Sequence, residues 1–298
     1  MITIGSRGSQ LALWQARHIA ARLAELGAET RLEIIKTTGD KILDVPLAKV
    51  GGKGLFTKEI EEALLAKTID LAVHSLKDVP AELPEGLTLS AIPEREDPRD
   101  ALVGTTLAEL KNGAKIGTSS LRRSAQLYAL GRGFVTETLR GNVDTRLRKL
   151  DEGQYDAIVL AAAGLRRLGW ADRIREMIPE ETMCPAVGQG ALAIETRDDG
   201  GEAQHLVRKL DDAASRAAVT AERALLATLG GGCQVPIGGH ARVEDGTIHL
   251  RAIVASPDGS RIIRGQRTGT DAMTIGNALG EELLAKGARE ILKEVYAS

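Results

Sequence analysis

The sequence repeats a unit in which a short apolar stretch leads through a polar turn into a helical pattern. The first copy runs from residues 2–4 through residues 5–9 into a helix that ends at Gly27, and a similar copy starts at residues 115–124. Alternating strands and helices are typical of an α/β fold, in which crossover helices return the chain to the same edge of a parallel sheet. We therefore expect parallel sheets with the polar turns gathered at the carboxyl ends of their strands.

A central copy of this unit ends in an adjacent ammonium group and carboxylate. Residues 71–73 have the composition of a buried strand, and Pro80 cannot donate to a sheet. Lys77 and Asp78 should therefore lie at the exit of that strand, where ligands bind in open α/β sheets. The alternative is that Asp78 only caps a turn and that Lys77 is its solvated neighbour.

Basic residues follow several of the predicted strands, as Arg7 does in the first turn. Residues 111–150 contain nine Lys and Arg and two acidic residues, a local charge of nine minus two, or +7, in a chain whose net charge is -2. A solvated helix face is the simpler explanation for any single arginine here. Their shared position after strands favours a cleft for anions, because a guanidinium pairs with a carboxylate through two parallel hydrogen bonds.

The composition argues against several other classes of function. Aromatic residues make up only 2% of the chain, too few for a stacking platform for single-stranded nucleic acid, and the net charge of -2 gives no field that attracts polyanions. The five histidines and two cysteines show no metal-ligand spacing, so no metal site is expected. The sequence shows no secretory pattern and no apolar stretch long enough for a membrane span, which predicts a cytoplasmic protein.

The pattern of residues 38–54 is typical of a mobile lid and not of a helix or a strand. They show no clear period, end in several glycines and carry Lys49 and Lys53, which predicts a mobile segment with two ammonium groups. Gly54 stands where a phosphate-binding loop needs Ser or Thr after its lysine, so nucleotide binding lacks support.

Two stretches predict crossings between domains. Prolines and acidic residues crowd residues 80–98, and the glycine-punctuated stretch 184–195 can return the chain to the first domain. Two crossings between paired α/β lobes would make a hinge with a cleft. In the remaining C-terminal part of the chain, the pattern predicts a helix, strands and a closing helix, which together indicate a small α+β domain. The predicted domains are residues 1–95 with 191–208, residues 96–190, and residues 209–298.

Cys233 follows three glycines in the stretch between a predicted helix and the strands of the third domain. A lone cysteine is usually a small buried apolar residue. Glycines that keep it out of a packed element favour the other reading, in which its thiol is presented for covalent chemistry.

Seven ordered motifs carry a resemblance to a known family. They are residues 6–15 (SRGSQLALWQ), 51–59 (GGKGLFTKE), 74–80 (HSLKDVP), 117–123 (GTSSLRR), 139–142 (LRGN), 185–190 (PAVGQG) and 232–237 (GCQVPI). Together these motifs closely resemble the porphobilinogen deaminase family, also called hydroxymethylbilane synthase, over nearly the whole chain.

The resemblance implies two lobes like those of periplasmic binding proteins, with a third domain that carries a cysteine. It implies a dipyrromethane cofactor attached through a thioether to Cys233, on which four porphobilinogen molecules are joined head to tail and released as hydroxymethylbilane. Loss of ammonia from the aminomethyl pyrrole leaves an azafulvenium cation. The matching catalytic carboxylate is Asp78, and a nearby carboxylate favours such a cation.

The resemblance also implies which residues bind the cofactor and the substrate, and it suggests a monomer. Cys184 matches no family role and is the weaker candidate for the modified thiol. The residues expected to bind the cofactor are Ser75, Lys77, Asp78, Thr118, Ser120, Arg122, Arg123 and Arg146. The residues expected to bind the substrate are Arg7, Ser9, Arg140, Arg146 and Arg167.

Two rival functions are compatible with part of this pattern. A two-lobed binding protein for small polycarboxylate anions, without catalysis, explains the arginines but not the presented cysteine. Nucleic-acid binding through the basic second domain is disfavoured by the scarcity of aromatic residues and by the overall charge.

Overall fold

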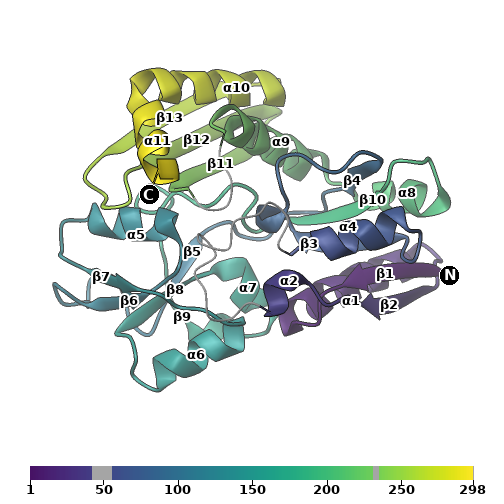
Figure 1. The fold of residues 1–298 in the computed structure, drawn as a ribbon, viewed down its shortest axis with the longest axis horizontal. Coiled ribbons are helices and arrows are strands. Elements are labelled where there is room, and N and C mark those ends of the chain that lie inside the picture. Colours follow the sequence, from purple (N-terminus) through teal and green to yellow (C-terminus); the bar gives the residue numbers. More distant parts are fainter. Residues whose placement is uncertain (42–55, 231–234, 298) are drawn as a thin grey trace. The chain divides into compact units, whose positions relative to one another are not determined.

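The computed structural model describes residues 1–41, 56–230 and 235–297 (Figure 1). The chain divides into two compact units, Met1–Glu96 with Ala191–Arg216 and Asp97–Gly190 with Ala217–Ser298. The sequence predicts three domains, a division that differs from these two units, and the three domains stay a prediction. Among the described residues, no helix combines the length and the apolar character that crossing a membrane would require.

Unit 1 is built on a five-stranded mixed sheet of order β2-β1-β3-β10-β4. Strand β1 runs parallel to both β2 and β3, whereas β10 runs antiparallel to β3 and β4. The expected purely parallel sheet is therefore wrong at β10, where the chain re-enters the unit in the opposite direction. The strands are β1 (Ile2–Ser6), β2 (Thr30–Ile34), β3 (Leu71–Ser75), β4 (Leu87–Ala91) and β10 (Leu192–Arg197).

Apolar side chains of the sheet in unit 1 pack against helix α1. Ser9 caps this helix by accepting a hydrogen bond from the backbone N–H of Ala12, and Ile19 and Leu23 on its inner face are fully buried. The same core contains Ile4 of β1 and residues of β3 and β10. The helices of the unit are α1 (Gln10–Glu25), α2 (Thr38–Lys41), α4 (Lys58–Leu65) and α8 (Glu202–Val207).

Unit 2 contains a second five-stranded mixed sheet, of order β7-β6-β8-β5-β9. Strands β7, β6 and β8 are mutually parallel, so their carboxyl ends lie at one edge, while β5 runs antiparallel to β8 and β9. The strands are β5 (Asp100–Val103), β6 (Lys115–Gly117), β7 (Val135–Glu137), β8 (Ala157–Ala161) and β9 (Ile174–Met177), and the helices are α5 (Leu121–Tyr128), α6 (Val143–Asp151) and α7 (Ala162–Arg167).

The same unit contains a three-stranded antiparallel sheet of order β11-β12-β13, with helices that share its core (Figure 1). Strand β11 was not predicted, because two glycines weaken its strand pattern. These glycines allow close packing: a Cβ on Gly238 would lie 3.0 Å from the carbonyl oxygen of Cys184. The elements are α9 (Ala213–Thr228), β11 (Ile237–Glu244), β12 (Thr247–Ala255), β13 (Ile262–Gly269), α10 (Ala272–Leu283) and α11 (Arg289–Ala297).

A buried carboxylate joins two parts of unit 2. Glu222 on α9 is fully buried, and its two oxygens accept hydrogen bonds of 2.7 Å from the backbone N–H groups of Gly188 and Ala241. Nearby, the N–H of Gly239 donates to the carbonyl oxygen of Pro185. Backbone groups that face each other across this junction are thus satisfied by partners within the unit.

Candidate active site

Asp78 lies at the exit of strand β3, as the sequence predicts. The strand passes into a single 3₁₀ turn, Leu76–Asp78, whose ends are fixed because Leu76 and Val79 are buried. The N–H of Leu76 donates to the carbonyl oxygen of Ala191, and the N–H of Val79 donates to that of Leu76. The side chain of Asp78 is exposed between these two anchors, and Lys77 beside it is half-buried. A charged carboxylate is thereby held on a rigid support and stays accessible to a ligand.

Further predicted residues of unit 1 lie at the same edge of the sheet. Strands β1 and β3 are parallel neighbours, so Arg7 and Ser9 after β1 share this edge with Ser75 at the end of β3. The guanidinium of Arg7 stacks 4.2 Å from the ring centroid of Phe56, a cation–π contact that orients it. The hydroxyl of Ser75 accepts a hydrogen bond of 2.8 Å from Gln15.

Three acidic or basic side chains are buried around β3, and sequence reasoning missed this cluster. His74 Nε2 lies 2.9 Å from Glu195 Oε2, and Glu61 on α4 is also buried. Burial, together with the charge of Glu195, raises the pKa of Glu61. Among the described residues, one carboxylate oxygen of Glu61 and one of Glu195 have no hydrogen-bond partner. The polar positions follow no local pattern, so no sequence signal could have identified the cluster.

In unit 2, two predicted arginines share one buried carboxylate. Asp100, at the start of β5, is fully buried. Its Oδ2 lies 2.7 Å from Nη1 of Arg122, and its Oδ1 accepts from Nε and Nη2 of Arg123 at 2.9 and 2.7 Å. Gln189 also donates to Asp100 at 3.0 Å. Burial alone would raise the pKa of Asp100, but the two guanidiniums hold it well below its usual range, whereas burial lowers the pKa of Arg123.

These three side chains carry two positive charges and one negative charge, and Asp100, Arg122 and Arg123 are all buried. The three nitrogens of Arg123 are engaged, because Nη1 donates to the carbonyl oxygen of Val159. Arg122 uses only Nη1 for its bonds to the described residues. Buried ion clusters favour charge balance, so an excess of one positive charge suits an anionic ligand.

The remaining predicted residues of unit 2 follow the parallel strands β6, β7 and β8, whose carboxyl ends share one edge. Thr118 and Ser120 follow β6, and the Thr118 hydroxyl accepts from the N–H of Ser120. Arg140 and Arg146 follow β7, with Nε of Arg146 donating to the Gly141 carbonyl oxygen at 2.8 Å. Arg167, on the helix after β8, donates to the carbonyl oxygen of Gly190 at 2.6 Å. The fold therefore brings all these predicted residues of unit 2 to one edge.

Three predicted residues, Lys49, Lys53 and Cys233, lie outside the described residues. The other cysteine, Cys184, is buried, and burial raises the pKa of its thiol to about 12. A thiol that is buried and protonated at neutral pH is a poor nucleophile.

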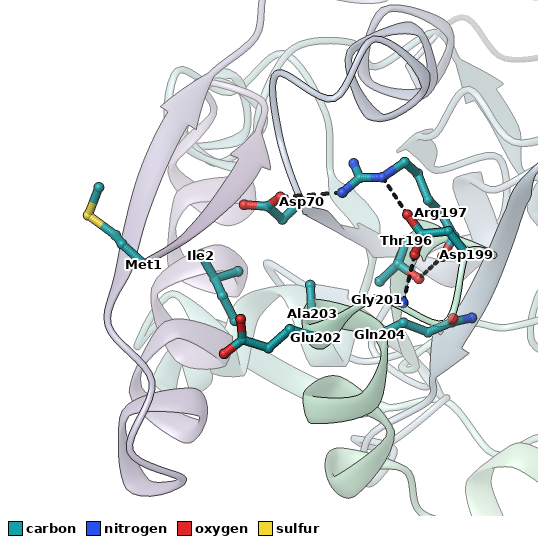
Figure 2. Close-up of a pocket in the computed structure, with 10 residues that line it drawn as sticks. All are labelled: Met1, Ile2, Asp70, Thr196, Arg197, Asp199, Gly201, Glu202, Ala203 and Gln204. Carbon is teal, nitrogen blue, oxygen red and sulfur yellow. Dashed lines mark hydrogen bonds and ion pairs between the residues drawn. The ribbon is translucent and has the colours of Figure 1, made fainter.

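A cavity of about 150 Å³ in unit 1 is lined by none of the predicted site residues (Figure 2). It is lined by the start of β1, by Asp70 just before β3 and by Arg197 at the end of the antiparallel β10. Arg197 pairs with Asp70 at 3.4 Å and with Asp199 at 3.0 Å. The cavity is therefore at the opposite edge of the sheet from Asp78, and its arginine is already paired with two carboxylates. Among the described residues, no group of three or more His, Cys, Asp or Glu side chains could hold a metal ion.

Solved structures resemble the fold at low sequence identity. A periplasmic substrate-binding protein of an ABC transporter from Coxiella burnetii is 13% identical, with a TM-score of 0.45, over 70% of this chain and 91% of that chain. The second substrate-binding domain of a putative amino acid ABC transporter from Streptococcus pneumoniae is also 13% identical, with a TM-score of 0.44, over 77% and 95%. This likeness is one of fold and does not favour a binding protein without catalysis.

Sequence comparisons identify the family. A model described as porphobilinogen deaminase, dipyromethane cofactor binding domain, matches residues 2–205, and one described as porphobilinogen deaminase, C-terminal domain, matches residues 216–285. A porphobilinogen deaminase from Syntrophobacter fumaroxidans is 55% identical, covering 99% of this chain and 98% of the relative. One from Brevibacillus brevis is 53% identical, covering 98% and 96%. Since both models match in order and the relatives align over nearly their full length, the chain belongs to the porphobilinogen deaminase family.

Proposed function

We propose that this chain joins four porphobilinogen molecules head to tail, with loss of ammonia, and releases hydroxymethylbilane from a dipyrromethane cofactor held by Cys233. Membership of the family makes the chain a transferase of tetrapyrrole synthesis with a dipyrromethane cofactor. The single observation that carries the residue-level proposal is the placement of Asp78, an exposed carboxylate on a rigid turn at the exit of β3.

Asp78 is proposed as the catalytic carboxylate. When the amino group of the substrate's aminomethyl substituent leaves as ammonia, the methylene carbon stays on the ring and positive charge develops on the pyrrole. A fixed carboxylate within hydrogen-bond reach of the pyrrole N–H stabilises that charge without having to reorganise, which lowers the barrier. Lys77 directly before it and Ser75 three positions before it add donors for the carboxylates of a ligand.

The arginines are proposed to bind the acetate and propionate groups of the pyrroles. The buried cluster of Asp100, Arg122 and Arg123 fits a carboxylate of the cofactor, because it has one excess positive charge and Arg122 keeps two N–H-bearing nitrogens outside the Asp100 bonds. Thr118, Ser120 and Arg146 would add donors at the same edge. When bound, dipyrromethane supplies the pyrrole carbon to which the first substrate is joined.

Substrate binding is proposed for Arg7, Ser9, Arg140, Arg146 and Arg167, with Lys49 and Lys53 contributing from a lid. Each added pyrrole carries two carboxylates, so a growing chain needs repeated neutralisation by guanidinium groups. For its partners and location, we propose that the enzyme is a monomer in the cytoplasm. Its substrate is porphobilinogen, and it binds neither nucleic acid nor a membrane.

The attachment of the cofactor to Cys233 is supported by the state of the other thiol. Cys184 is buried, and the pKa of about 12 of its thiol leaves it almost wholly protonated at neutral pH. The chain has two cysteines, so Cys233 is the remaining candidate for a thioether.

Intact-protein mass spectrometry tests this assignment. The purified chain should be heavier than its sequence by two linked pyrroles, Cys233→Ser should lack this increment, and the matched control Cys184→Ser should keep it. An active chain without the increment, or a Cys233→Ser chain that retains it, would contradict the proposal.

A further inference from the structure

Gln126 lies one turn after Arg122 on helix α5 and touches the same backbone carbonyl. The two residues are four positions apart, so they share a face of the helix. Nη1 of Arg122 donates to the Cys184 carbonyl oxygen at 2.7 Å, and Nε2 of Gln126 donates to the same oxygen at 3.2 Å. The Cys184 carbonyl is therefore held from two directions by α5.

The amide of Gln126 is used completely. Its Oε1 accepts a hydrogen bond of 2.7 Å from the N–H of Cys184, and its Nε2 also donates to the carbonyl oxygen of Arg122 at 3.1 Å. Gln126 is 2% exposed, so each of these bonds forms away from water, where a lost partner is costly. The amide thus fixes the backbone N–H and C=O of Cys184 against α5.

The guanidinium of Arg122 is oriented by two acceptors at a single nitrogen. Nη1 donates to Asp100 Oδ2 and to the Cys184 carbonyl oxygen, each at 2.7 Å. A guanidinium is planar, so fixing both hydrogens of Nη1 also fixes the direction of the opposite edge, Nε and Nη2. Arg122 is 4% exposed, and among the described residues this edge has no hydrogen-bond partner.

We infer that Gln126 is a positioning residue for the ligand-binding edge of Arg122. By holding the Cys184 carbonyl in place, it directs Nε and Nη2 of Arg122 toward a carboxylate of the bound pyrroles. The inference rests on the proposed function, because that function supplies the carboxylate. It adds a residue that touches neither cofactor nor substrate and acts through Arg122.

A double-mutant cycle tests the inference. The full-length chain is produced without porphobilinogen, porphobilinogen is then added, and the rate constant of cofactor loading is followed by intact mass. Arg122→Lys and Gln126→Met should each slow loading about tenfold. Each variant disturbs the same charge-assisted hydrogen bonds between the guanidinium of Arg122 and a carboxylate of the pyrroles. The double variant should load at about the rate of the slower single variant. The effects of two residues that act through one contact on the free energy of activation are not additive.

Matched controls separate positioning from a purely structural role. Gln154→Met and Gln154→Glu change an exposed glutamine of the same unit and should load at the rate of the unaltered chain. A purely structural role for Gln126 would lower the melting temperature and leave the loading rate of Gln126→Met unchanged, and that result would overturn the inference. If Gln126→Met does slow loading, a double variant whose slowing is the product of the two single effects would overturn it as well.

A second variant covers the case in which Gln126→Met fails to fold. Gln126→Glu keeps the acceptor for the Cys184 N–H but adds a negative charge beside Arg122, so loading should slow, with a weaker dependence on salt. Loading of Gln126→Glu at the unaltered rate would overturn the inference. If the unaltered chain itself gains no mass, the proposed function fails, and this outcome is distinct from failure of the positioning role alone.

Discussion

Carboxylates of unit 1 that lie on or around strand β3 and its following turn have opposite environments. Asp78 is exposed at the end of β3, whereas Glu195 is fully buried beside His74 and Glu61 is buried on α4. A group that meets a developing charge must be reachable, so Asp78 suits catalysis. The buried pair and Glu61 instead support the strand from which the turn of Asp78 extends.

Replacing Asp78 should abolish turnover without unfolding the chain. Asp78→Ala removes an exposed side chain, so its melting temperature should stay close to that of the unaltered chain, while the turnover rate should fall by at least about 100-fold because the electrostatic stabilisation is lost. Rate assays with porphobilinogen, together with thermal melts, measure both effects. Glu85→Ala removes another exposed carboxylate of unit 1 and should leave the rate unchanged; a near-normal rate for Asp78→Ala would exclude its role.

Glu61 should make stability depend on pH. Its pKa is raised in the folded chain, mainly by burial, so the folded state binds a proton more tightly than the unfolded state. Its contribution is fully present below the unfolded pKa, which is about 4.3, and is lost as pH rises through the folded pKa. Glu61→Gln should therefore flatten the fall in unfolding free energy above that pH.

Urea unfolding across this pH range measures the effect. Between acidic and alkaline pH, Glu61→Gln should lose less unfolding free energy than the unaltered chain, because glutamine has no proton to release as the pH rises through the raised pKa of Glu61. Glu62→Gln, an exposed neighbour on the same helix, serves as the control. A Glu61→Gln chain with the same pH profile as Glu62→Gln would show that Glu61 is not the responsible group.

The elements bring the polar turns together through strand direction. Strands β1 and β3 are parallel, and so are β6, β7 and β8, so turns far apart in the sequence meet at one edge of each sheet. This geometry is the reason that Asp78 shares an edge with Arg7, and that Thr118 shares one with Arg140. Each antiparallel strand, β10 or β5, contributes its amino-terminal end to the same edge, which is how Asp100 meets α5.

Packing of strand β11 should tolerate no side chain at Gly238. A Cβ there would lie 2.9 Å from Ile253 and 3.0 Å from the carbonyl oxygen of Cys184. Gly238→Ala should therefore lower the unfolding free energy by about 1–3 kcal/mol, the usual cost of overpacking. Gly8→Ala, whose new Cβ would make only an ordinary contact of 3.5 Å, is the control. Equal urea midpoints for the two variants would contradict the close packing.

At the scale of the whole molecule, charge is strongly segregated. Residues 111–150 carry +7, so the other 258 residues carry -2 minus 7, or -9. The basic stretch includes Arg122, Arg123, Arg140 and Arg146, which follow parallel strands of unit 2. A local excess of positive charge in a nearly neutral protein attracts small anions without attracting long polyanions.

Salt should therefore weaken substrate binding more than catalysis. Raising the ionic strength from about 0.05 M to about 0.5 M shortens the screening length and should raise the KM for porphobilinogen several-fold, with a smaller change in kcat. Steady-state kinetics at the two salt concentrations measures this split. Arg140→Gln should show a smaller salt effect on KM, and a KM that does not respond to salt would exclude electrostatic attraction.

Much of the candidate site could be predicted from the sequence, because its signals are local. Pro80 limits how far the strand before Asp78 can extend, and a serine caps the helix after Arg7, so these positions follow from neighbouring residues. Strand β11 was missed because Gly238 and Gly239 lack a strand pattern. The need for glycine at position 238 depends on Cys184, which is more than fifty positions away.

The sequence by itself determined the α/β class, the polar turns at the strand exits and the family. These properties depend on local periodicity, on turn chemistry and on ordered motifs. Only the tertiary structure decided that Arg122 and Arg123 share Asp100, that Gln126 holds Cys184, and that Glu61 lies near Glu195. Each of these contacts joins residues that folding brings together through strand direction and packing, so no pattern within one segment of the chain specifies it.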